Sequence, residues 1–491
     1  PESFTPDDKY YLGEAPELPG FWVAAGYNSI GIISSGGAGM ALAQWISDGE
    51  PPFDLWDVDI RRAQPFQRNK LYLRERVKET LGLLYADHYP YRQVESARNI
   101  RRSPLHQHLK ERGAVFGEIA GWERANWFAR KGQENHYVYD WGKQNWFKNH
   151  KEEHEAVRET AGLFDMTSFG KIRIEGKDSC KFLQYICCSD VDVIPGKIIY
   201  TQMLNKRGGI ECDLTVTRLS SESYLLVVPG ATLQRDLSWL KKHKKGFAVS
   251  IIDFSAAESV LVLMGPNSRK ILENISPNDF SNDAHPFSFA KEIEIGFGLA
   301  RAHRISYVGE LGWELYVSSE MACHIFEEIE KAGNDYDLKL CGIHTLDSCR
   351  IEKGFRHFGH DITDEDHILE AGMGFTVSKT KDTFIGKEAV LEKKVEGLNR
   401  RLAQFKLLNS EQMLFHNEPI IRDGEVVSYL TSANYGHHVG SAIGLGYIPS
   451  KGETIEELMK SNYEIDIAGE IVKASVSFKP LYDPKAERVK M

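Results

Sequence analysis

From about residue 150 onward, the sequence repeats short runs of alternating apolar residues that are separated by glycine turns and by segments with helical spacing. An alternation with a period of two is typical of strands that bury one face. Ile172 and Ile174 show this alternation, whereas Leu233 and Leu237 recur at the spacing of a helix. Strands interleaved with helices in this way predict an α+β domain.

After the charged segment 391–401, the pattern becomes all-β. A strand is predicted near 402–408, and the Asp-Gly pair within 422–425 is typical of a hairpin turn. In the last predicted strand, 472–478, apolar residues alternate with lysine and serine. We therefore expect a small β-barrel to close the C-terminal part of the chain.

The N-terminal part predicts a strand, a glycine-rich loop and a helix. Residues 21–27 form a compact apolar run and predict a buried strand, the glycines of 34–39 predict a loop, and 40–46 predict a helix that ends at Gly49. Peptide N–H groups of the segment 26–32 are suited to the pyrimidine edge of a flavin. A glycine turn needed only for packing explains the same residues equally well.

The stretch from about 55 to 135 is basic and aromatic. It contains an amphipathic helix near 71–85, in which Leu73, Val77, Leu81 and Leu84 form the apolar stripe. Because this stretch lacks a catalytic pattern, we expect it to connect two domains.

Composition excludes several classes of protein. A chain of 491 residues usually forms two to four domains, and its net charge of −10 gives no attraction to nucleic acid. No uncharged apolar run approaches the roughly 20 residues of a membrane-spanning helix, so we expect no membrane insertion. The seven cysteines contain no CxxC pair, which favours a reducing compartment and buried packing thiols. Motifs of hydrolases and kinases are lacking.

Asp213 is the first candidate for chemistry. The segment 200–216 predicts two strands around a turn at 206–209, with Asp213 at the very start of the second strand. A half-buried strand favours an apolar residue there, so a carboxylate needs a partner. The alternative is a solvated aspartate at the end of a turn, which is the commoner role of a lone aspartate.

Glu314 is the second candidate. The segment 304–315 predicts two strands around a glycine turn, and alternation places Glu314 on the face opposite Trp313 and Leu315. An ordinary outward-facing strand glutamate has the same pattern.

Arg350 is the third candidate, on a predicted helix that ends at a glycine cap at Gly354. It either binds an anion or pairs with Glu352. His357 and His360 on the following loop are spaced by a glycine without a supporting shell, so we expect no metal site.

In this order, the segments resemble the folate-binding aminomethyltransferase fold of the glycine-cleavage T-protein over residues 116–485. The motifs that carry the resemblance are 154–158 with 161–167, Gly208-Gly209 to Asp213, Tyr307 to Glu314, Arg350 to Gly354, and Phe384 to Ala389. The N-terminal piece resembles the last strand and helix of the FAD domain in sarcosine and dimethylglycine dehydrogenases, and 55–135 resembles their connecting domain. The resemblance implies four parts: an FAD-domain remnant (1–54), a connecting domain (55–115), the folate-binding domain (116–395) and the barrel (396–491).

The resemblance also implies roles for individual residues. Asp213 would be the catalytic carboxylate near the folate N5 and N10 atoms, and Glu314 would accept hydrogen bonds from the pterin. Tyr200 and Tyr307 would wall the pocket, and Arg350 would contact folate. The residues expected against the flavin are Asn28, Ser29, Ile30, Gly31 and Ile32. Pro229 stands where the free-standing T-protein usually carries an asparagine.

The implied activity is folate-linked oxidative N-demethylation of sarcosine or dimethylglycine, in which this chain transfers the one-carbon unit to tetrahydrofolate and yields 5,10-methylenetetrahydrofolate. The flavin would need an electron acceptor, and residues expected to bind FAD firmly belong upstream of Pro1. The compartment would be a bacterial cytoplasm or the mitochondrial matrix. Two alternatives stay open: a non-catalytic regulator resembling the pyruvate dehydrogenase phosphatase regulatory subunit, and a free-standing folate-dependent demethylase.

Overall fold

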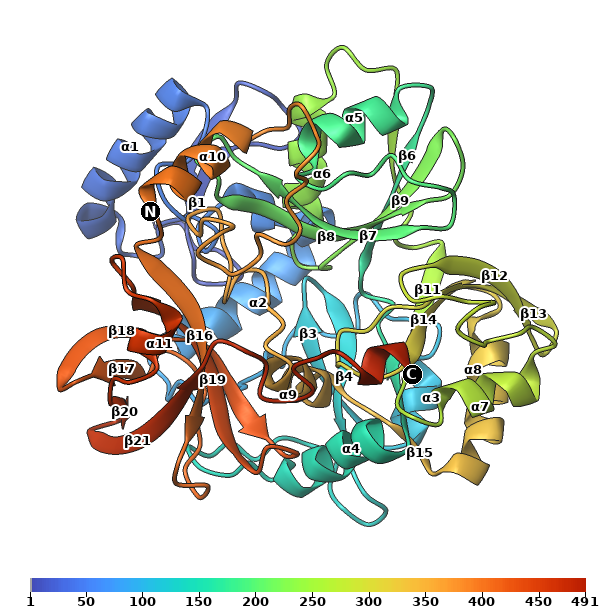
Figure 1. The fold of residues 1–491 in the computed structure, drawn as a ribbon. Helices are drawn as coiled ribbons and strands as arrows, with labels where there is room; N and C mark the ends of the chain where they lie inside the picture. The colour runs from blue at the N-terminus through green and yellow to red at the C-terminus, as the bar shows by residue number, and fades with distance from the viewer. Residues whose placement is uncertain (1) are drawn as a thin grey trace.

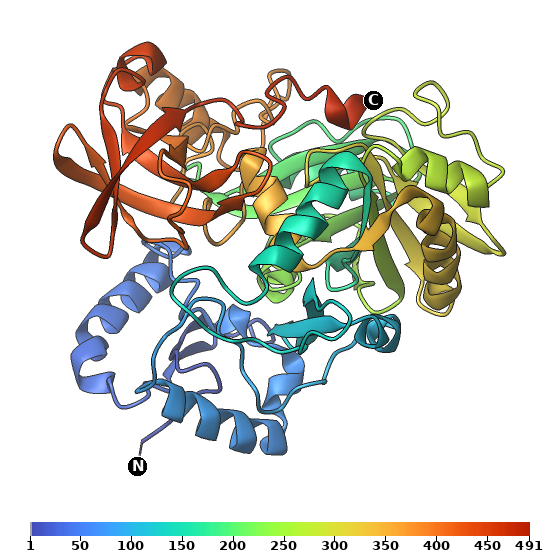
Figure 2. The same cartoon turned by 90° about the horizontal axis from the view of Figure 1, so that it is seen from below.

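The computed structural model describes residues 2–491. An α+β body with two sheets forms the centre, a β-barrel lies beside it, and the N-terminal segments lie along one side of both (Figures 1 and 2). Figure 2 shows the N-terminal segments in blue below the barrel and the α+β body.

Two sheets build the α+β body, of which the first is antiparallel and the second is mixed. The first has the strand order β10-β6-β9-β8-β7, formed by β6 (Gly170–Glu175), β7 (Ile198–Leu204), β8 (Ile210–Arg218), β9 (Ser223–Val228) and β10 (Ser250–Asp253). The second has the order β12-β13-β14-β11-β5-β15, formed by β5 (Ala161–Asp165), β11 (Glu258–Met264), β12 (Ala290–Ile295), β13 (Gly298–His303), β14 (Gly312–Ser318) and β15 (Leu338–Leu340). The helices are α4 (Phe147–Glu159), α5 (Ser179–Ile186), α6 (Leu233–His243), α7 (Ser268–Ile275), α8 (Ala322–Gly333) and α9 (Ile343–Glu352), with a 3₁₀ turn at Asn334–Tyr336.

The outer face of the first sheet packs on helices. Ile172 and Ile174 of β6 and Leu214 of β8 share a buried core with Phe182 of α5 and Leu237 of α6. Strand alternation therefore turns the neighbouring residues of β7 and β8 to the opposite, inner face. The predicted α+β fold is confirmed.

The C-terminal strands form the expected closed barrel. Its order is β16-β19-β18-β17-β20-β21, with β16 (Arg400–Leu407), β17 (Pro419–Arg422), β18 (Glu425–Gly436), β19 (Ser441–Pro449), β20 (Tyr463–Ile467) and β21 (Glu470–Ser477). Asp423 and Gly424 make the predicted hairpin turn with φ angles of 51° and 88°. Helices α10 (Lys387–Glu396) and α11 (Ile455–Leu458) and a 3₁₀ turn at Arg488–Lys490 complete this part.

The N-terminal segments form smaller units. They are β1 (Tyr11–Glu14), β2 (Trp22–Ala25), α1 (Gly31–Asp48), 3₁₀ turns at Ile60–Arg62 and Pro65–Arg68, α2 (Lys70–Leu83), α3 (His106–Glu111), β3 (Ala114–Ile119) and β4 (Trp122–Phe128). The boundary expected between 115 and 116 falls inside β3. None of the helices in residues 2–491 is long and apolar enough to cross a bilayer.

The glycine-rich stretch 34–39 is helix, not loop, because α1 begins at Gly31. A Cβ added at Gly36, Gly37 or Gly39 would meet nothing within 4 Å, so these glycines are not there for close packing. The helix is held instead by Trp45 and two alanines, which pack with Leu12 of β1. Tertiary burial thus outweighs the helix-weakening effect of glycine.

Helix α2 is correctly predicted, but its buried face is not the predicted stripe. Tyr72, Arg76 and Thr80 are buried, whereas Leu81 and Leu84 are exposed. Arg76 is accommodated because its Nη1 donates to Glu118 Oε2 over 2.8 Å. Strand β2 is likewise partly exposed, so its predicted burial is wrong.

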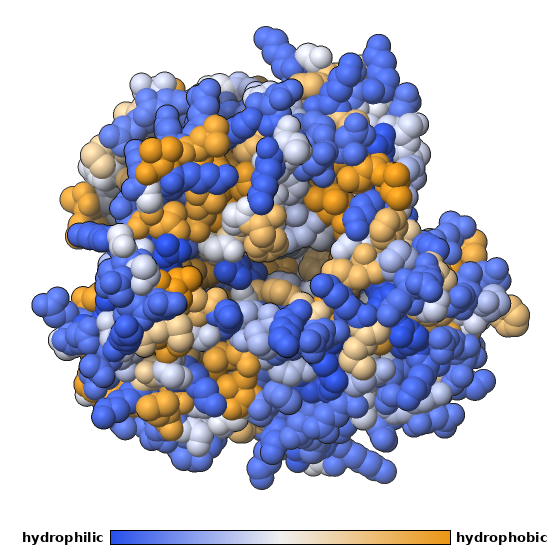
Figure 3. Space-filling model, in the orientation of Figure 1, coloured by the Kyte–Doolittle hydropathy of each residue, from blue (hydrophilic) through white to orange (hydrophobic). Residues whose placement is uncertain are grey.

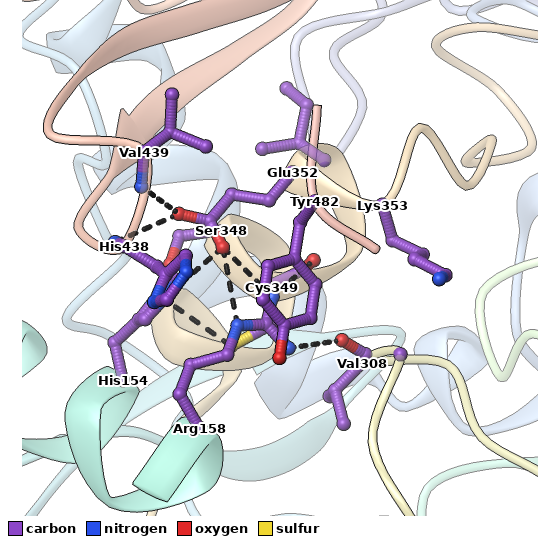
Figure 4. Close-up of polar contacts among 12 residues, drawn as sticks. His154, Arg158, Val308, Ser348, Cys349, Glu352, Lys353, His438, Val439 and Tyr482 are labelled. Atoms are coloured by element: carbon purple, nitrogen blue, oxygen red, sulfur yellow. Dashed lines mark hydrogen bonds and ion pairs between the residues drawn. The ribbon is translucent and has the colours of Figure 1, made fainter. Parts of the chain in front are cut away.

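A buried polar network fastens the barrel to the α+β body. Glu352 at the end of α9 accepts hydrogen bonds from His154 Nε2 (3.1 Å) and Arg158 Nη2 (2.9 Å) on α4 (Figure 4). Its other oxygen accepts from the backbone N–H groups of His438 and Val439 in the β18–β19 turn, over 2.9 and 3.0 Å. Because Glu352, His154 and Arg158 are buried, the three elements are joined at one carboxylate inside the protein.

Candidate functional site

The molecule is hollowed near the centre of the face shown in Figure 3, below β7 and β8 in the matching view of Figure 1. A hollow of about 310 Å³ lies beside β7, and its lining includes Lys197, Tyr200, Phe375 and Thr376. Tyr200 is 39% exposed, so the ring is open to a ligand.

Asp213 lies on the inner face of the first sheet. It is the fourth residue of β8, not its first, and it faces Gln202 of β7 directly across the strand pair. Gln202 Nε2 donates to Asp213 Oδ1 over 2.8 Å. The aspartate is half-buried and partnered, so the alternative of a solvated residue at a turn is wrong.

Burial changes the acidity of this carboxyl. It raises the pKa of Asp213 to about 6, although the hydrogen bond from Gln202 and the charge of Arg356 oppose the rise. A carboxyl with this pKa is mostly ionised at neutral pH and still exchanges a proton readily. Asp213 is therefore suited to general acid–base work.

Glu314 lies in the middle of β14, on the face opposite Trp313 and Leu315, as alternation predicted. It is only 7% exposed, so an ordinary outward-facing glutamate is excluded. Tyr316 Oη donates to Glu314 Oε2 over 2.7 Å. Burial raises the pKa of Glu314 to about 7.

The two acids project from sheet faces that pack together. Val227 of β9 pairs with Thr215, two residues from Asp213, and Val262 of β11 pairs with Glu314. Val227 and Val262 belong to one buried cluster. Asp213 and Glu314 therefore line the same interior from opposite sheets. The segment 304–311 between β13 and β14 is a loop, so the strand expected to begin at Arg304 is absent from this part of the structure.

Tyr307 lies in that loop. Its Oη donates to the carbonyl oxygen of Arg356 over 2.8 Å, and its ring stacks on Phe355 with centroids 6.0 Å apart. Burial raises the pKa of Tyr307 above its ordinary value, and the nearby Asp213 and Asp347 act in the same direction. The ring is thus a fixed neutral wall close enough to Asp213 to feel its charge.

Arg350 is buried between two carboxylates. Its Nε donates to Asp347 Oδ1 and its Nη1 to Asp361 Oδ2, both over 2.7 Å, and Nη1 also lies 3.2 Å from Ser432 Oγ in the barrel. The pairing with Glu352 is not formed. Because two acids already balance its charge, Arg350 has a visible structural role, and its contact with folate stays a prediction.

The segment predicted to lie against a flavin forms the start of α1. Asn28 is buried and bonded to Thr5, whose backbone N–H donates to Asn28 Oδ1 over 2.8 Å. Asn28 and Ser29 have φ angles of 46° and 66°, and Ile32 is 99% exposed. Asn28 therefore shapes the turn, while the residues from Ile30 to Ile32 present an open surface. Flavin contact stays a prediction.

The histidines and cysteines are the remaining candidate residues. In residues 2–491, no group of three or more His, Cys, Asp or Glu side chains is arranged to hold a metal ion. Five of the seven free cysteines are buried, as expected for packing thiols. The sequence analysis did not identify Gln202 or Thr376. A bulge between Met203 and Leu204 shifts the hairpin register so that Gln202 faces Asp213, and no local signal identifies Thr376.

Family models cover most of the chain. The GCVT N-terminal domain matches residues 105–381. The chain belongs to the glycine cleavage T-protein family. The C-terminal barrel domain of the glycine cleavage T-protein matches 400–483, and the FAD-dependent oxidoreductase central domain matches 48–103. The resemblance found in the sequence is confirmed, including its oxidoreductase part.

Several curated proteins align along the chain. The 4-methylaminobutanoate oxidase (formaldehyde-forming) of Paenarthrobacter nicotinovorans is 42% identical over 491 residues, which is all of this chain and 59% of that protein. Mitochondrial sarcosine dehydrogenase of Mus musculus is 36% identical over all of this chain and 58% of its own length. The mitochondrial pyruvate dehydrogenase phosphatase regulatory subunit of Mus musculus is 32% identical over 98% of this chain and 57% of its own. The chain thus spans under three fifths of the length of each of these relatives.

A solved structure has the same fold. The crystal structure of the glycine cleavage system aminomethyltransferase T from Bartonella henselae covers 79% of this chain and 99% of its own, with a TM-score of 0.67 and 24% identity.

Proposed function

We propose that this chain binds tetrahydrofolate between its two sheets and transfers to it the one-carbon unit released by oxidation of an N-methyl amine. The observation that supports this most is the pair of partly protonatable carboxyls, Asp213 and Glu314, on facing sheets, with the partly exposed Tyr200 beside Asp213. A pterin offers ring N–H groups to one acid and reactive nitrogens to the other. Two acids placed in this way therefore suit the N–H groups and nitrogens of folate.

In this proposal, FAD would supply, when bound, the oxidation that converts the N-methyl group into a methylene iminium. The folate N5 and N10 atoms replace the amine on that carbon, two C–N bonds form, and both of their hydrogens end on the released amine. Asp213 would take the proton from the attacking nitrogen and return it to the leaving amine. Its pKa of about 6 suits both transfers near neutral pH.

Glu314 would hold the pterin by accepting hydrogen bonds from its ring N–H groups, while Tyr200 and Tyr307 would cover its faces. Enclosure between the sheets would keep water from the iminium, which otherwise hydrolyses to formaldehyde. Residues 28–32 would contribute one edge of the flavin site, and the flavin would pass its electrons to a further acceptor. A direct Arg350–folate contact belongs to the same proposal.

The substrate class is a small secondary or tertiary N-methyl amino acid. The names of the relatives support sarcosine, dimethylglycine and 4-methylaminobutanoate as substrates to compare. The bacterial and mitochondrial origin of these relatives supports a bacterial cytoplasm or the mitochondrial matrix as the compartment.

Calorimetric titration with tetrahydrofolate tests the proposal on this chain directly. We expect binding that is weakened at least tenfold in Asp213→Ala and in Glu314→Ala, with Thr217→Val as a control in the same sheet. If the wild-type chain does not bind tetrahydrofolate, a regulatory protein becomes the better explanation, which the third relative represents.

A further inference from the structure

Gln202 and Thr376 form a hydrogen-bonded chain that ends on Asp213. Thr376 Oγ1 lies 2.6 Å from Gln202 Oε1, and Gln202 Nε2 lies 2.8 Å from Asp213 Oδ1. Gln202 is fully buried and Thr376 nearly so. A hydroxyl donor at the amide oxygen turns the NH₂ group toward the carboxylate, so the order of bonds suits an ionised Asp213.

The Thr376 hydroxyl has one proton and a second acceptor within reach. Its Oγ1 also lies 2.8 Å from the carbonyl oxygen of Met373. When the proton points to Met373, Oγ1 becomes an acceptor. If the Gln202 amide then turns over, its NH₂ group donates to Thr376 and its oxygen accepts from a protonated Asp213. Every buried group keeps a partner in both arrangements, and leaving one without a partner is costly.

Two other polar groups act on Asp213. Arg356 on the 355–361 loop can only donate, so it favours the ionised carboxylate, whereas the Tyr200 hydroxyl on β7 can donate or accept. Tyr307 donates to the Arg356 carbonyl. The thiol of Cys188 lies 3.8 Å from Gln202 Oε1 and is only a weak donor. Gln202 is therefore the buried group that can either donate to Asp213 or accept from it, with Thr376 behind it.

We propose that Gln202 and Thr376 are positioning residues whose hydrogen bonds reverse direction as Asp213 gains and loses a proton. The role rests on the proposed function, because the proton in question is the one exchanged with folate and the amine. The reversal keeps the carboxyl in one place while its charge changes, so that the nitrogen it serves does not lose its alignment.

Infrared titration of the Asp213 carboxyl tests the role of Gln202 without any folate. The band of this carboxyl is identified by its loss in Asp213→Asn. We expect Gln202→Met to raise the pKa of Asp213 by up to about one unit, at most a tenfold change in the protonation equilibrium, because the charged carboxylate loses a stronger hydrogen bond than the neutral acid does. The C=O band of the protonated acid should shift as well, because its acceptor is lost. An unchanged pKa and band would overturn the role of Gln202.

The reversal itself is tested with Thr376→Val. Because Thr376 serves as donor in one arrangement and acceptor in the other, we expect tetrahydrofolate to bind about three- to tenfold more weakly both at pH 5 and at pH 8. Thr376→Ser should restore binding at both values. A loss at only one pH would contradict the reversal. Thr217→Val is the matched control, because Thr217 is buried in β8 and its hydroxyl has no partner in residues 2–491.

The two proposals fail separately. If the wild-type chain does not bind tetrahydrofolate, the proposed function is wrong. The infrared shift in Gln202→Met does not depend on folate and tests the positioning role alone. Normal folate binding together with an unmoved pKa sinks the positioning role alone.

Discussion

Tyr316 donates a hydrogen bond of 2.7 Å to Glu314, two residues away on the same face of β14. This bond stabilises the ionised carboxylate against burial, which raises the pKa of Glu314 to about 7. The balance between the two effects determines the fraction of Glu314 that can accept hydrogen bonds from a ligand at neutral pH.

We therefore expect Tyr316→Phe to raise the pKa of Glu314 further and to weaken tetrahydrofolate binding several-fold at pH 7, with recovery toward pH 9. Calorimetry across that pH range measures the effect. Tyr336→Phe, which changes a tyrosine outside this sheet face, is the control. A pH-independent loss would show that Tyr316 acts through packing and not through the charge of Glu314.

Asp213→Asn should leave the fold intact and change the fate of the one-carbon unit. In a protein that also contains the oxidising part, we expect the ratio of methylenetetrahydrofolate to formaldehyde to fall by about 10²-fold or more, as for loss of a general acid–base group. Formaldehyde and folate products are measured in the same reaction. A product ratio equal to that of the wild type would exclude the proposed role.

Glu352→Gln should destabilise the protein, because it removes one of the two buried acids that pair with Arg158 and leaves only Glu310. Removing one partner of a buried pair costs about 3–5 kcal/mol, which urea unfolding measures. Glu152→Gln, at an exposed pair with Arg130, should cost at most about 1 kcal/mol. Similar losses in the two variants would contradict the anchoring role of Glu352.

The same carboxylate should make the protein sensitive to acid. Burial alone would raise its pKa, but His154 and Arg158 lower the pKa of Glu352 to about 2, against 4.5 as the ordinary value. Its contribution to stability is therefore complete above about pH 4.5 and is lost as the pH falls toward 2. Urea unfolding at pH 6, 4 and 3 should show a steeper loss in the wild type than in Glu352→Gln.

Gly36→Ala tests the helix that replaced a predicted loop. Gly36 lies inside α1 with open space around its Cβ position, so alanine should stabilise the protein by about 0.5–1 kcal/mol. Gly49→Ala should have the opposite effect, because Gly49 ends the helix with a φ of 78°. Thermal unfolding distinguishes the two, and destabilisation by Gly36→Ala would favour the loop.

Local patterns determined much of this protein before any coordinates. Alternation alone placed Glu314 on the face opposite Trp313. The pairing of Gln202 with Asp213 is different, because a bulge between Met203 and Leu204 shifts the register of that hairpin. The face of Glu314 depends only on its neighbours in the chain, so the pleat of a strand is sufficient to predict it.

Only the tertiary structure decided the rest. Thr376 hydrogen-bonds to Gln202, although 174 residues separate them in the sequence. Arg350 pairs with Asp361 and not with Glu352, because Glu352 is hydrogen-bonded to Arg158 of α4. The glycines of α1 stay helical, and Leu81 and Leu84 of the predicted stripe stay exposed, because burial depends on which surfaces meet. Such tertiary contacts join residues far apart in sequence, and the hydrophobic periodicity of the sequence carries no information about them.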